Sequence, residues 1–365
     1  MVQLRILILL RMRFAIAALP VLVLVGLVPA RAQDFTIGLA APLSGDFAEL
    51  GTQWAEGART AAQGDEAVQL VEADDQCTPE GGAEAARQLV EAGVEIVIGF
   101  LCTTAVEAAM PILKEAKIPV VTPVRTGGLT DHKERTGWPV YRLGPRDDAE
   151  REAVATILTR RWRDELFAIV DDGTIYGREL AENFRAEAEL AGLQPVFIDT
   201  FRPQMDNQIG LVGRLRRAGA THVFVGGDRA DIAIMARDAV NLDYDVVLAG
   251  GEALRAEDGE VPLTEGVLMV GLPRWEVFAS PEVLEALREA GIEPEGYVIP
   301  GHAALELATG AARVAAADEV PVMEVLENFA FDTALGVVRF NEKGDLARSP
   351  YGLFRYDGER FVEVE

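Results

Sequence analysis

Apolar runs and amphipathic stretches alternate regularly along the first third of the chain. A run of four to seven apolar residues indicates a buried strand, and apolar residues that recur every three to four positions indicate a helix. On this basis we expect strands at 35–41, 68–73, 94–98 and 118–122, separated by helices at 52–64, 79–92 and 104–117. Such alternation favours a parallel sheet that is covered by helices on both faces.

The alternation starts again after residues 140–146. Helices are predicted at 148–161, 176–191, 207–218 and 230–241, and strands at 166–171, 193–200, 221–226, 245–249 and 267–270. The chain therefore contains two α/β units of similar size. We place the first crossing between them near residues 142–146.

The last quarter of the chain is mainly helical. Its pattern predicts helices at 281–290, 297–317 and 322–329, followed by short strands at 337–340 and 352–356. These elements could form a third domain. We favour their return to complete the two earlier units, because three short helices and a hairpin bury little apolar area alone.

The N-terminus has the pattern of a secretory signal peptide. Arginines precede an apolar run at 14–28, and Ala30-Arg31-Ala32 resembles a cleavage site. A permanent membrane anchor is the alternative, but the apolar core is short for a stable span. We expect a signal peptide at 1–32, cleaved after Ala32, and export to the periplasm. Translation could also start at Met12.

Removing residues 1–32 leaves a strongly acidic chain of 333 residues. The full chain has 34 Lys and Arg and 59 Asp and Glu; four arginines are lost, so the net charge is 30 minus 59, or −29. This charge repels nucleic acid and anionic lipid. A chain of this length is expected to divide its core between two domains.

Cys77 and Cys102 are the only two cysteines. In an exported protein an even number of cysteines suggests a disulfide. Closing a loop of this length should stabilise the folded state by roughly 3–4 kcal/mol in the chain-entropy model. Two free buried thiols remain the alternative.

Hydroxyl side chains follow two successive strands of the first unit. Thr103 and Thr104 open a helix after one strand, and Thr126 follows the next. The N-terminus of a helix favours a carboxylate, and the hydroxyls would add donors. Alternatively the threonines only cap the helix, since Thr104 and Glu107 fit a capping box. Ser44 lies in the turn after the first strand, which is either a plain turn or a ligand contact.

Acidic and aromatic residues follow the strands of the second unit. They are Asp171, Asp172, Tyr176, Asp228 and Glu252, with Arg229 beside Asp228. In open parallel sheets ligands bind beyond the carboxyl ends of the strands, where an acid can bind an ammonium group. The alternative is that these acids cap helices or face solvent.

Several other functions lack support in the sequence. His132, His222 and His302 are isolated from each other and from acids or cysteines at metal-ligand spacing, so no metal is expected. Neither a phosphate-binding loop nor a nucleophile elbow is present. We therefore expect no cofactor and no enzymatic activity; an exported hydrolase would need a nucleophile and a base.

Several segments, in the order in which they follow one another, resemble those of the periplasmic branched-chain amino-acid-binding proteins, the type I solute-binding proteins of ABC importers. The resemblance covers nearly all of the chain after residue 32. It is carried by residues 37–45, 74–77 with 98–103, 118–126, 172–177 and 331–345. It implies two doubly wound parallel-sheet lobes joined by three hinge crossings, with boundaries at 33–143 plus 274–346 and 144–273 plus 347–365.

The resemblance also implies roles for individual residues. Thr103 and Thr126 would bind the ligand carboxylate, with backbone help from Leu101 and Val124. Glu252 would bind the ammonium group, and Tyr176 would line the cleft. Cys77 and Cys102 fall in the segment that carries the disulfide in the family.

Three positions depart from the family pattern. Leu50 replaces an aromatic wall residue, Asp228 replaces a tyrosine, and Arg125 stands where a small residue is common. These changes put extra charge near the pocket and weaken the case for leucine, isoleucine or valine. A more polar amino acid, an amide or another small carboxylate fits better.

The resemblance implies a monomeric periplasmic receptor that closes on a small ligand and delivers it to an inner-membrane ABC permease. The hinge crossings would lie near 142–146, 271–274 and 346–350. A sensory receptor of the same fold, passing its signal to a partner protein, is the alternative.

Overall fold

The computed structural model describes residues 35–364, so the expected signal peptide lies outside the described residues. The first sheet has five parallel strands in the order β2-β1-β3-β4-β5. Its strands are β1 (Phe35–Ala41), β2 (Val68–Asp74), β3 (Ile96–Gly99), β4 (Val120–Thr122) and β5 (Val140–Arg142). Their side chains are mostly apolar and buried, as expected for a sheet covered on both faces.

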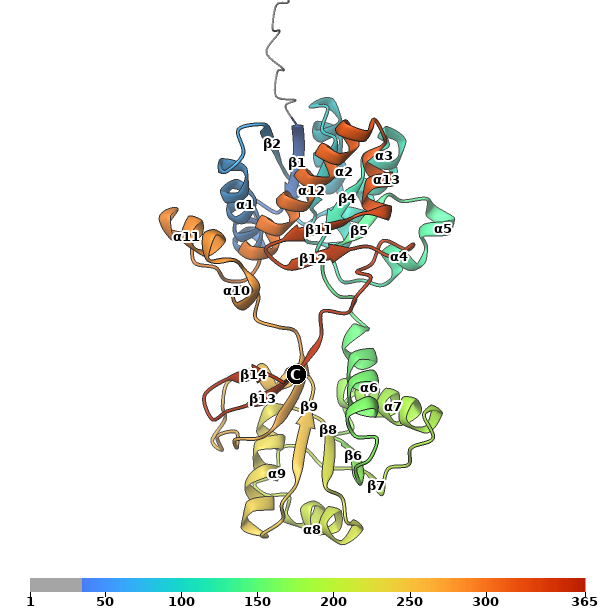
Figure 1. The fold of residues 1–365 in the computed structure, drawn as a ribbon, viewed down its shortest axis with the longest axis vertical. Coiled ribbons are helices and arrows are strands. Elements are labelled where there is room, and N and C mark those ends of the chain that lie inside the picture. The colour runs from blue at the N-terminus through green and yellow to red at the C-terminus, as the bar shows by residue number, and fades with distance from the viewer. Residues whose placement is uncertain (1–34, 365) are drawn as a thin grey trace, which may run out of the picture. The chain divides into compact units, whose positions relative to one another are not determined.

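Helices cover both faces of the first sheet (Figure 1). One face packs on α1 (Ala48–Gln63), α12 (Val298–Asp318) and α13 (Val322–Asn328), and the other on α2 (Pro79–Glu91) and α3 (Thr103–Ala116). The shorter helices are α4 (Gly128–Asp131), α5 (Lys133–Thr136), α10 (Trp275–Phe278) and α11 (Pro281–Glu289).

The second sheet has seven strands in the order β14-β13-β10-β9-β8-β6-β7. Five are parallel: β6 (Phe167–Asp171), β7 (Phe197–Thr200), β8 (His222–Gly226), β9 (Val247–Gly250) and β10 (Leu268–Gly271). Two antiparallel strands, β13 (Gly352–Tyr356) and β14 (Phe361–Glu363), extend its edge. Helices α6 (Ala149–Arg161) and α7 (Ile175–Leu190) cover one face, and α8 (Ile209–Ala218) and α9 (Arg229–Asn241) the other. The 3-10 helix η1 (Glu252–Arg255) follows β9.

The C-terminal elements complete both units, as predicted, and the alternative of a third domain is wrong. Helices α12 and α13 share the core of the first sheet, while β13 pairs with β10 of the second. The hairpin of β11 (Ala330–Thr333) and β12 (Gly336–Arg339) also packs on the first core. The chain thus passes between the sheets three times: between β5 and α6, between β10 and α11, and between β12 and β13. These features confirm the predicted fold class.

Most deviations from the predicted elements are at their ends. Helix α1 begins four residues earlier than expected, because its first turn is largely exposed and carries no apolar repeat. Strand β5 was not predicted, and its last residue, Arg142, falls in the range expected for the first crossing. Strands β11 and β14 were not predicted. Within residues 35–364, no helix is long and apolar enough to cross a membrane.

Candidate functional site

Both sheets have the same topological switch point. In the first sheet, β1 lies between β2 and β3, so the chain leaves β1 and β3 toward opposite edges. In the second sheet, β6 lies between β7 and β8 in the same way. The crevice outside the carboxyl ends of strands at such a point is the usual ligand site of open α/β sheets. All predicted site residues except Leu50, which lies in α1, follow a strand end in one of the two sheets.

Thr103 and Thr126 are brought together at the first switch point. Thr103 opens α3 after β3, and Thr126 lies in the turn after β4. Their hydroxyl oxygens are 2.7 Å apart, and either can donate to the other. Both side chains are partly buried. The pair can therefore present a hydroxyl donor to an anion beside the free N–H groups at the start of α3.

The alternative that these threonines only cap helix α3 is wrong. Helix α3 begins at Thr103, its N-cap is Cys102, and among the described residues no side chain caps it. Thr104 thus lies inside the first turn and forms no capping box with Glu107. The N–H groups of Thr103 and Thr104 have no acceptor among the described residues, which leaves them available to a ligand, whereas Ala105 N–H donates to the Cys102 carbonyl.

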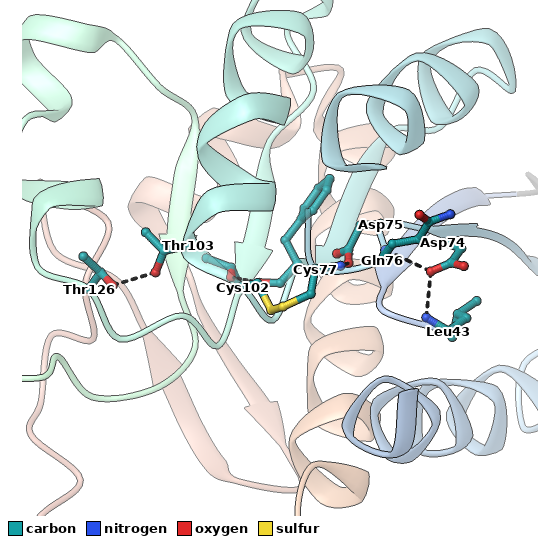
Figure 2. Close-up of a disulfide and its surroundings, with 10 residues drawn as sticks. Leu43, Asp74, Asp75, Gln76, Cys77, Cys102, Thr103 and Thr126 are labelled. Atoms are coloured by element: carbon teal, nitrogen blue, oxygen red, sulfur yellow. Dashed lines mark hydrogen bonds between the residues drawn. A yellow bond between two sulfur atoms is a disulfide. The ribbon is translucent and has the colours of Figure 1, made fainter. Parts of the chain in front are cut away.

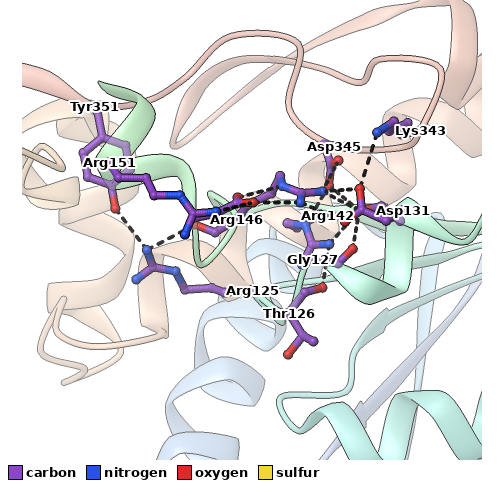
Figure 3. Close-up of polar contacts among 12 residues, drawn as sticks. Arg125, Thr126, Gly127, Asp131, Arg142, Arg146, Arg151, Lys343, Asp345 and Tyr351 are labelled. Atoms are coloured by element: carbon purple, nitrogen blue, oxygen red, sulfur yellow. Dashed lines mark hydrogen bonds and ion pairs between the residues drawn. The ribbon is translucent and has the colours of Figure 1, made fainter. Parts of the chain in front are cut away.

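The turn that holds Thr126 is tied to a buried arginine (Figure 3). Arg142, at the end of β5, donates to the backbone carbonyls of Val124 and Thr126, the latter at 2.9 Å. Its Nε lies 2.8 Å from Asp345 Oδ1, and both side chains are at least 92% buried. Val124 N–H donates to Thr122 Oγ1 at 3.2 Å, so the backbone group that was expected to help bind the ligand already has a partner.

The expected disulfide joins Cys77 and Cys102 (Figure 2). It links the segment after β2 to the residue that precedes Thr103, with the two Cα atoms 5.3 Å apart. No free thiol is present in the chain, and the alternative of two free thiols is wrong. Nearby, Ser44 Oγ donates to Asp74 Oδ2 at 2.5 Å, so the turn after β1 is tied to the end of β2.

A cluster of acids and tyrosine hydroxyls lies at the second switch point. Tyr176 O–H donates to Glu150 Oε1 at 2.6 Å, and Glu252 N–H donates to the same oxygen at 2.7 Å. Burial raises the pKa of Glu150, while these two hydrogen bonds oppose that rise. Burial and the nearby Glu150 raise the pKa of Tyr176, so its hydroxyl stays protonated at neutral pH.

The carboxylate of Glu252 is held by two of the three connections between the sheets. Its Oε1 accepts from Leu272 N–H at 2.8 Å, just after β10, and its Oε2 accepts from Tyr351 O–H at 3.3 Å, just before β13. Arg125 donates to the Tyr351 hydroxyl at 3.0 Å (Figure 3). Tyr351 therefore links the turn after β4 to the candidate ammonium-binding acid.

Glu150 and Tyr351 were not found from the sequence. Glu150 stands in the first turn of α6, where an acid is expected simply because it complements the helix dipole. Tyr351 lies 99 residues from Glu252, and no local pattern connects them. Their proximity depends on the tertiary fold.

The other residues that the sequence placed at or near the site differ in their surroundings. Asp228 is the N-cap of α9 and accepts from Asp231 N–H at 2.9 Å, which is the capping alternative. Arg229 is 93% buried, pairs with Asp258 at 2.7 Å and packs over Tyr356, so it adds no free charge to the site. Leu50 is 38% exposed, and Leu101 lies partly buried just before Cys102.

Comparison with known proteins shows the family to which this chain belongs. A family model described as "Periplasmic binding protein" matches residues 34–360. The chain belongs to this family. Members of the periplasmic binding protein family are binding proteins. Among the described residues, no group of three or more acids, histidines or cysteines is arranged so that it could hold a metal ion.

Curated relatives align over nearly the whole length of this periplasmic binding protein. The "Leu/Ile/Val-binding protein homolog 3" of Brucella melitensis is 29% identical over 93% of the chain and 96% of the relative. The "Leucine-, isoleucine-, valine-, threonine-, and alanine-binding protein" of Pseudomonas aeruginosa is 26% identical over 89% and 90%.

A solved structure with the same fold is a putative branched-chain amino acid ABC transporter protein from Rhodospirillum rubrum. It has a TM-score of 0.73 and 18% identity, and the match covers 91% of the chain and 100% of that structure. At this identity the likeness shows the fold alone.

Proposed function

We propose that this protein is the solute receptor of an ABC importer and binds a small amino-acid-like or carboxylate ligand. The observation that carries the proposal is the Thr103–Thr126 hydroxyl pair, which lies at the switch point of the first sheet beside the start of α3. Two hydroxyls and free helix N–H groups are suited to a carboxylate. Curated relatives at 26–29% identity are named for branched-chain amino acids, which supports the same class.

In this proposal the ligand is bound between two lobes that close on it. The lobes would comprise 33–143 plus 274–346 and 144–273 plus 347–365. Support comes from the two separate sheets and their separate cores, and from the three connections between them. Few-residue hinges of this kind accommodate domain closure around ligands.

Residues of the second sheet would bind the other end of the ligand. Glu252 and Tyr176 follow β9 and β6, and their hydrogen bonds to Glu150 hold them together. Ser44, Leu50, Leu101, Val124 and Asp228 would line the site or fix its turns. Micromolar binding corresponds to about 8 kcal/mol, which a desolvated carboxylate match together with pocket burial can supply.

The partner of the ligand-loaded protein would be an inner-membrane permease, and the receptor would act in the periplasm as a monomer. Support for this location is the family and the signal-like sequence at 1–32. Ligand binding would then lead to transport by the importer and not to a chemical reaction.

A thermal-shift screen tests the binding proposal. The panel should contain neutral, acidic and basic L-amino acids, their primary amides, benzoate and 4-hydroxybenzoate. A ligand at 100 times its Kd adds about 2.7 kcal/mol to the free energy of unfolding, so a true ligand raises the melting temperature clearly. Calorimetry then gives the affinity of each hit. No shift with any member of the panel would contradict the proposal.

A further inference from the structure

Tyr351 belongs to the core of the second sheet but forms a hydrogen bond with the first unit. The residue is 7% exposed, and its ring packs in the apolar cluster that contains Val270 and Leu353. Its hydroxyl oxygen accepts from Arg125 Nη2 at 3.0 Å (Figure 3). Because Arg125 lies in the turn after β4, this bond joins a buried ring of one unit to a turn of the other.

The chemistry of the groups around the Tyr351 hydroxyl fixes the direction of its hydrogen bonds. A guanidinium can only donate, and a carboxylate can only accept. The hydroxyl therefore accepts from Arg125 and donates its proton to Glu252 Oε2 at 3.3 Å. Burial raises the pKa of Tyr351, so the hydroxyl keeps this proton at neutral pH. The two bonds polarise each other, and loss of the hydroxyl removes both.

The same series of hydrogen bonds reaches all three connections between the sheets. In the first connection, Asp147 N–H donates to the Arg125 carbonyl at 2.9 Å. In the second, Leu272 N–H donates to Glu252 Oε1 at 2.8 Å. Tyr351 ends the third connection, next to β13. Its hydroxyl is thus the central link of a path that runs from Asp147 to Leu272.

The bond between Arg125 and Tyr351 spans a short stretch in which the third connection can bend. Ala347 N–H donates to the Arg339 carbonyl of β12 at 2.8 Å, so the connection stays with the first unit as far as Ala347. Tyr351, four residues later, is already in the second core. Bending is therefore concentrated at 348–350, and a rotation of one unit against the other acts directly on the bond from Arg125.

We propose that Tyr351 is a positioning residue that couples the two halves of the candidate site to the bending of the three connections. Through Arg125 it holds the turn that carries Thr126, and through Glu252 it holds the segment after β9. The three connections then bend together and not separately. This coupling goes beyond the proposed function and does not depend on the identity of the ligand; only its effect on affinity rests on the proposed function.

Hydrogen exchange of the ligand-free protein tests the coupling. Tyr351→Phe keeps the buried ring and removes the hydroxyl. Peptides that contain Asp147 or Leu272, whose N–H groups bond to other residues, should exchange about three-fold faster or more, the scale of one hydrogen bond. Ser349→Ala is the matched control, because the Ser349 hydroxyl accepts from Tyr351 N–H at 3.4 Å in the same connection. It should speed exchange at 346–352 alone, and a similarly local effect in Tyr351→Phe would overturn the coupling.

A double-mutant cycle separates coupling through Tyr351 from direct coupling. Arg125→Met removes the donor to Tyr351 and should speed exchange of the peptide that contains Leu272. In the Tyr351→Phe background the same change should add less than about 1.5-fold, because the path is already broken. Arg151→Met, which removes an arginine that pairs with Glu179 on the surface, is the control and should leave that peptide unchanged. No effect of Arg125→Met, or an equal effect in both backgrounds, would overturn the role of Tyr351.

Calorimetry shows whether the coupling matters for binding. The probe is L-leucine or, where it does not bind, the tightest ligand of the panel. Tyr351→Phe should bind about three-fold more weakly or worse, because the two halves of the site are no longer held in place before binding. Ser349→Ala should stay within about 1.5-fold of the wild type. Unchanged affinity in Tyr351→Phe would overturn the coupling to the site. If no panel member binds the wild type, the proposed function fails, while the exchange experiments still decide the role of Tyr351.

Discussion

The hydroxyl oxygens of Thr103 and Thr126 lie 2.7 Å apart, although 23 residues separate them in the chain. The two turns meet because β3 and β4 are parallel neighbours, and their carboxyl ends lie at the same edge of the sheet. One side chain comes from a helix start and the other from a loop held by Arg142. The pair can thus act as one hydroxyl site rather than as two separate threonines.

Removing either hydroxyl should weaken carboxylate binding. Thr103→Val and Thr126→Val should each cost about 1–3 kcal/mol of binding free energy, because a buried carboxylate oxygen is left underpaired. Because the two hydroxyls contact each other, the double variant should lose less than the sum of the single losses. Calorimetry of a panel ligand measures this, with Thr103→Ser and Thr126→Ser as controls. Unchanged affinity in both valine variants would assign the pair a structural role.

Charge removal at Glu252 should discriminate between ligand classes. Glu252→Gln keeps an acceptor for Leu272 N–H but removes the negative charge. An amino acid should then bind more weakly, by at least several-fold, while a simple carboxylic acid should bind almost as before. Competition calorimetry with L-leucine and benzoate measures the difference. An equal loss for both would contradict an ammonium-binding role and favour a role in holding the inter-sheet connections.

The strand ends of the site could be predicted from sequence because they depend on local patterns. A buried apolar run followed by a polar turn places Thr103, Thr126 and Glu252 without knowledge of the tertiary structure. The environment of each residue could not be predicted in this way. Arg229 looks like an extra charge in the sequence, but it is buried against Asp258 because η1 and the following loop fold back onto α9.

Long-range partners explain the other residues that sequence reasoning missed. Glu150 has the position of an ordinary acid at a helix start, and its hydrogen bonds with Tyr176 and Glu252 join it to residues 26 and 102 positions away in the chain. Arg142 appeared to be a hinge residue, since a charged residue at the end of a three-residue run seldom indicates a buried strand. Asp345 makes its burial possible.

The Arg142–Asp345 pair should be essential for folding and for the Thr126 turn. Asp345→Asn leaves a buried guanidinium without its counter-charge, and loss of one partner of such a pair costs about 3–5 kcal/mol. Asp131→Asn is the matched control, because Asp131 likewise pairs with an arginine, Arg146, but its side chain is 41% exposed; this change should cost less than about 1 kcal/mol. Urea unfolding gives both values. Hydrogen exchange should also become faster at 124–127, and similar losses for both variants would refute the prediction.

The disulfide should stabilise the folded chain without forming part of the ligand contact. Replacing Cys77 and Cys102 together by serine opens a loop of 25 residues, for which the chain-entropy model gives a loss of about 3–4 kcal/mol. Urea unfolding of the double variant and of the reduced wild type should give similar values. Affinity measured well below the melting temperature should change little. A loss under about 1 kcal/mol would show that the link is not needed for stability.

Neighbouring acids at the end of β2 should have opposite effects on pH-dependent stability (Figure 2). Asp75 is fully buried, and burial raises its pKa to about 6; the hydrogen bond from Cys77 N–H only partly opposes this. Burial also acts on Asp74, but hydrogen bonds from Ser44, Gln76 and Leu43 outweigh it and lower the pKa of that carboxyl.

A raised folded-state pKa contributes stability that is complete below about pH 4 and is lost as the pH rises through 6. Asp75→Asn should therefore gain about 2–3 kcal/mol relative to the wild type between pH 4 and pH 7. For Asp74 the sign is reversed: its contribution is present at neutral pH and is lost as the pH falls through its lowered pKa. Asp74→Asn should thus destabilise the protein at pH 7 and progressively less at acidic pH. Urea unfolding of both variants from pH 3 to pH 8 measures the two trends, and parallel pH profiles would contradict them.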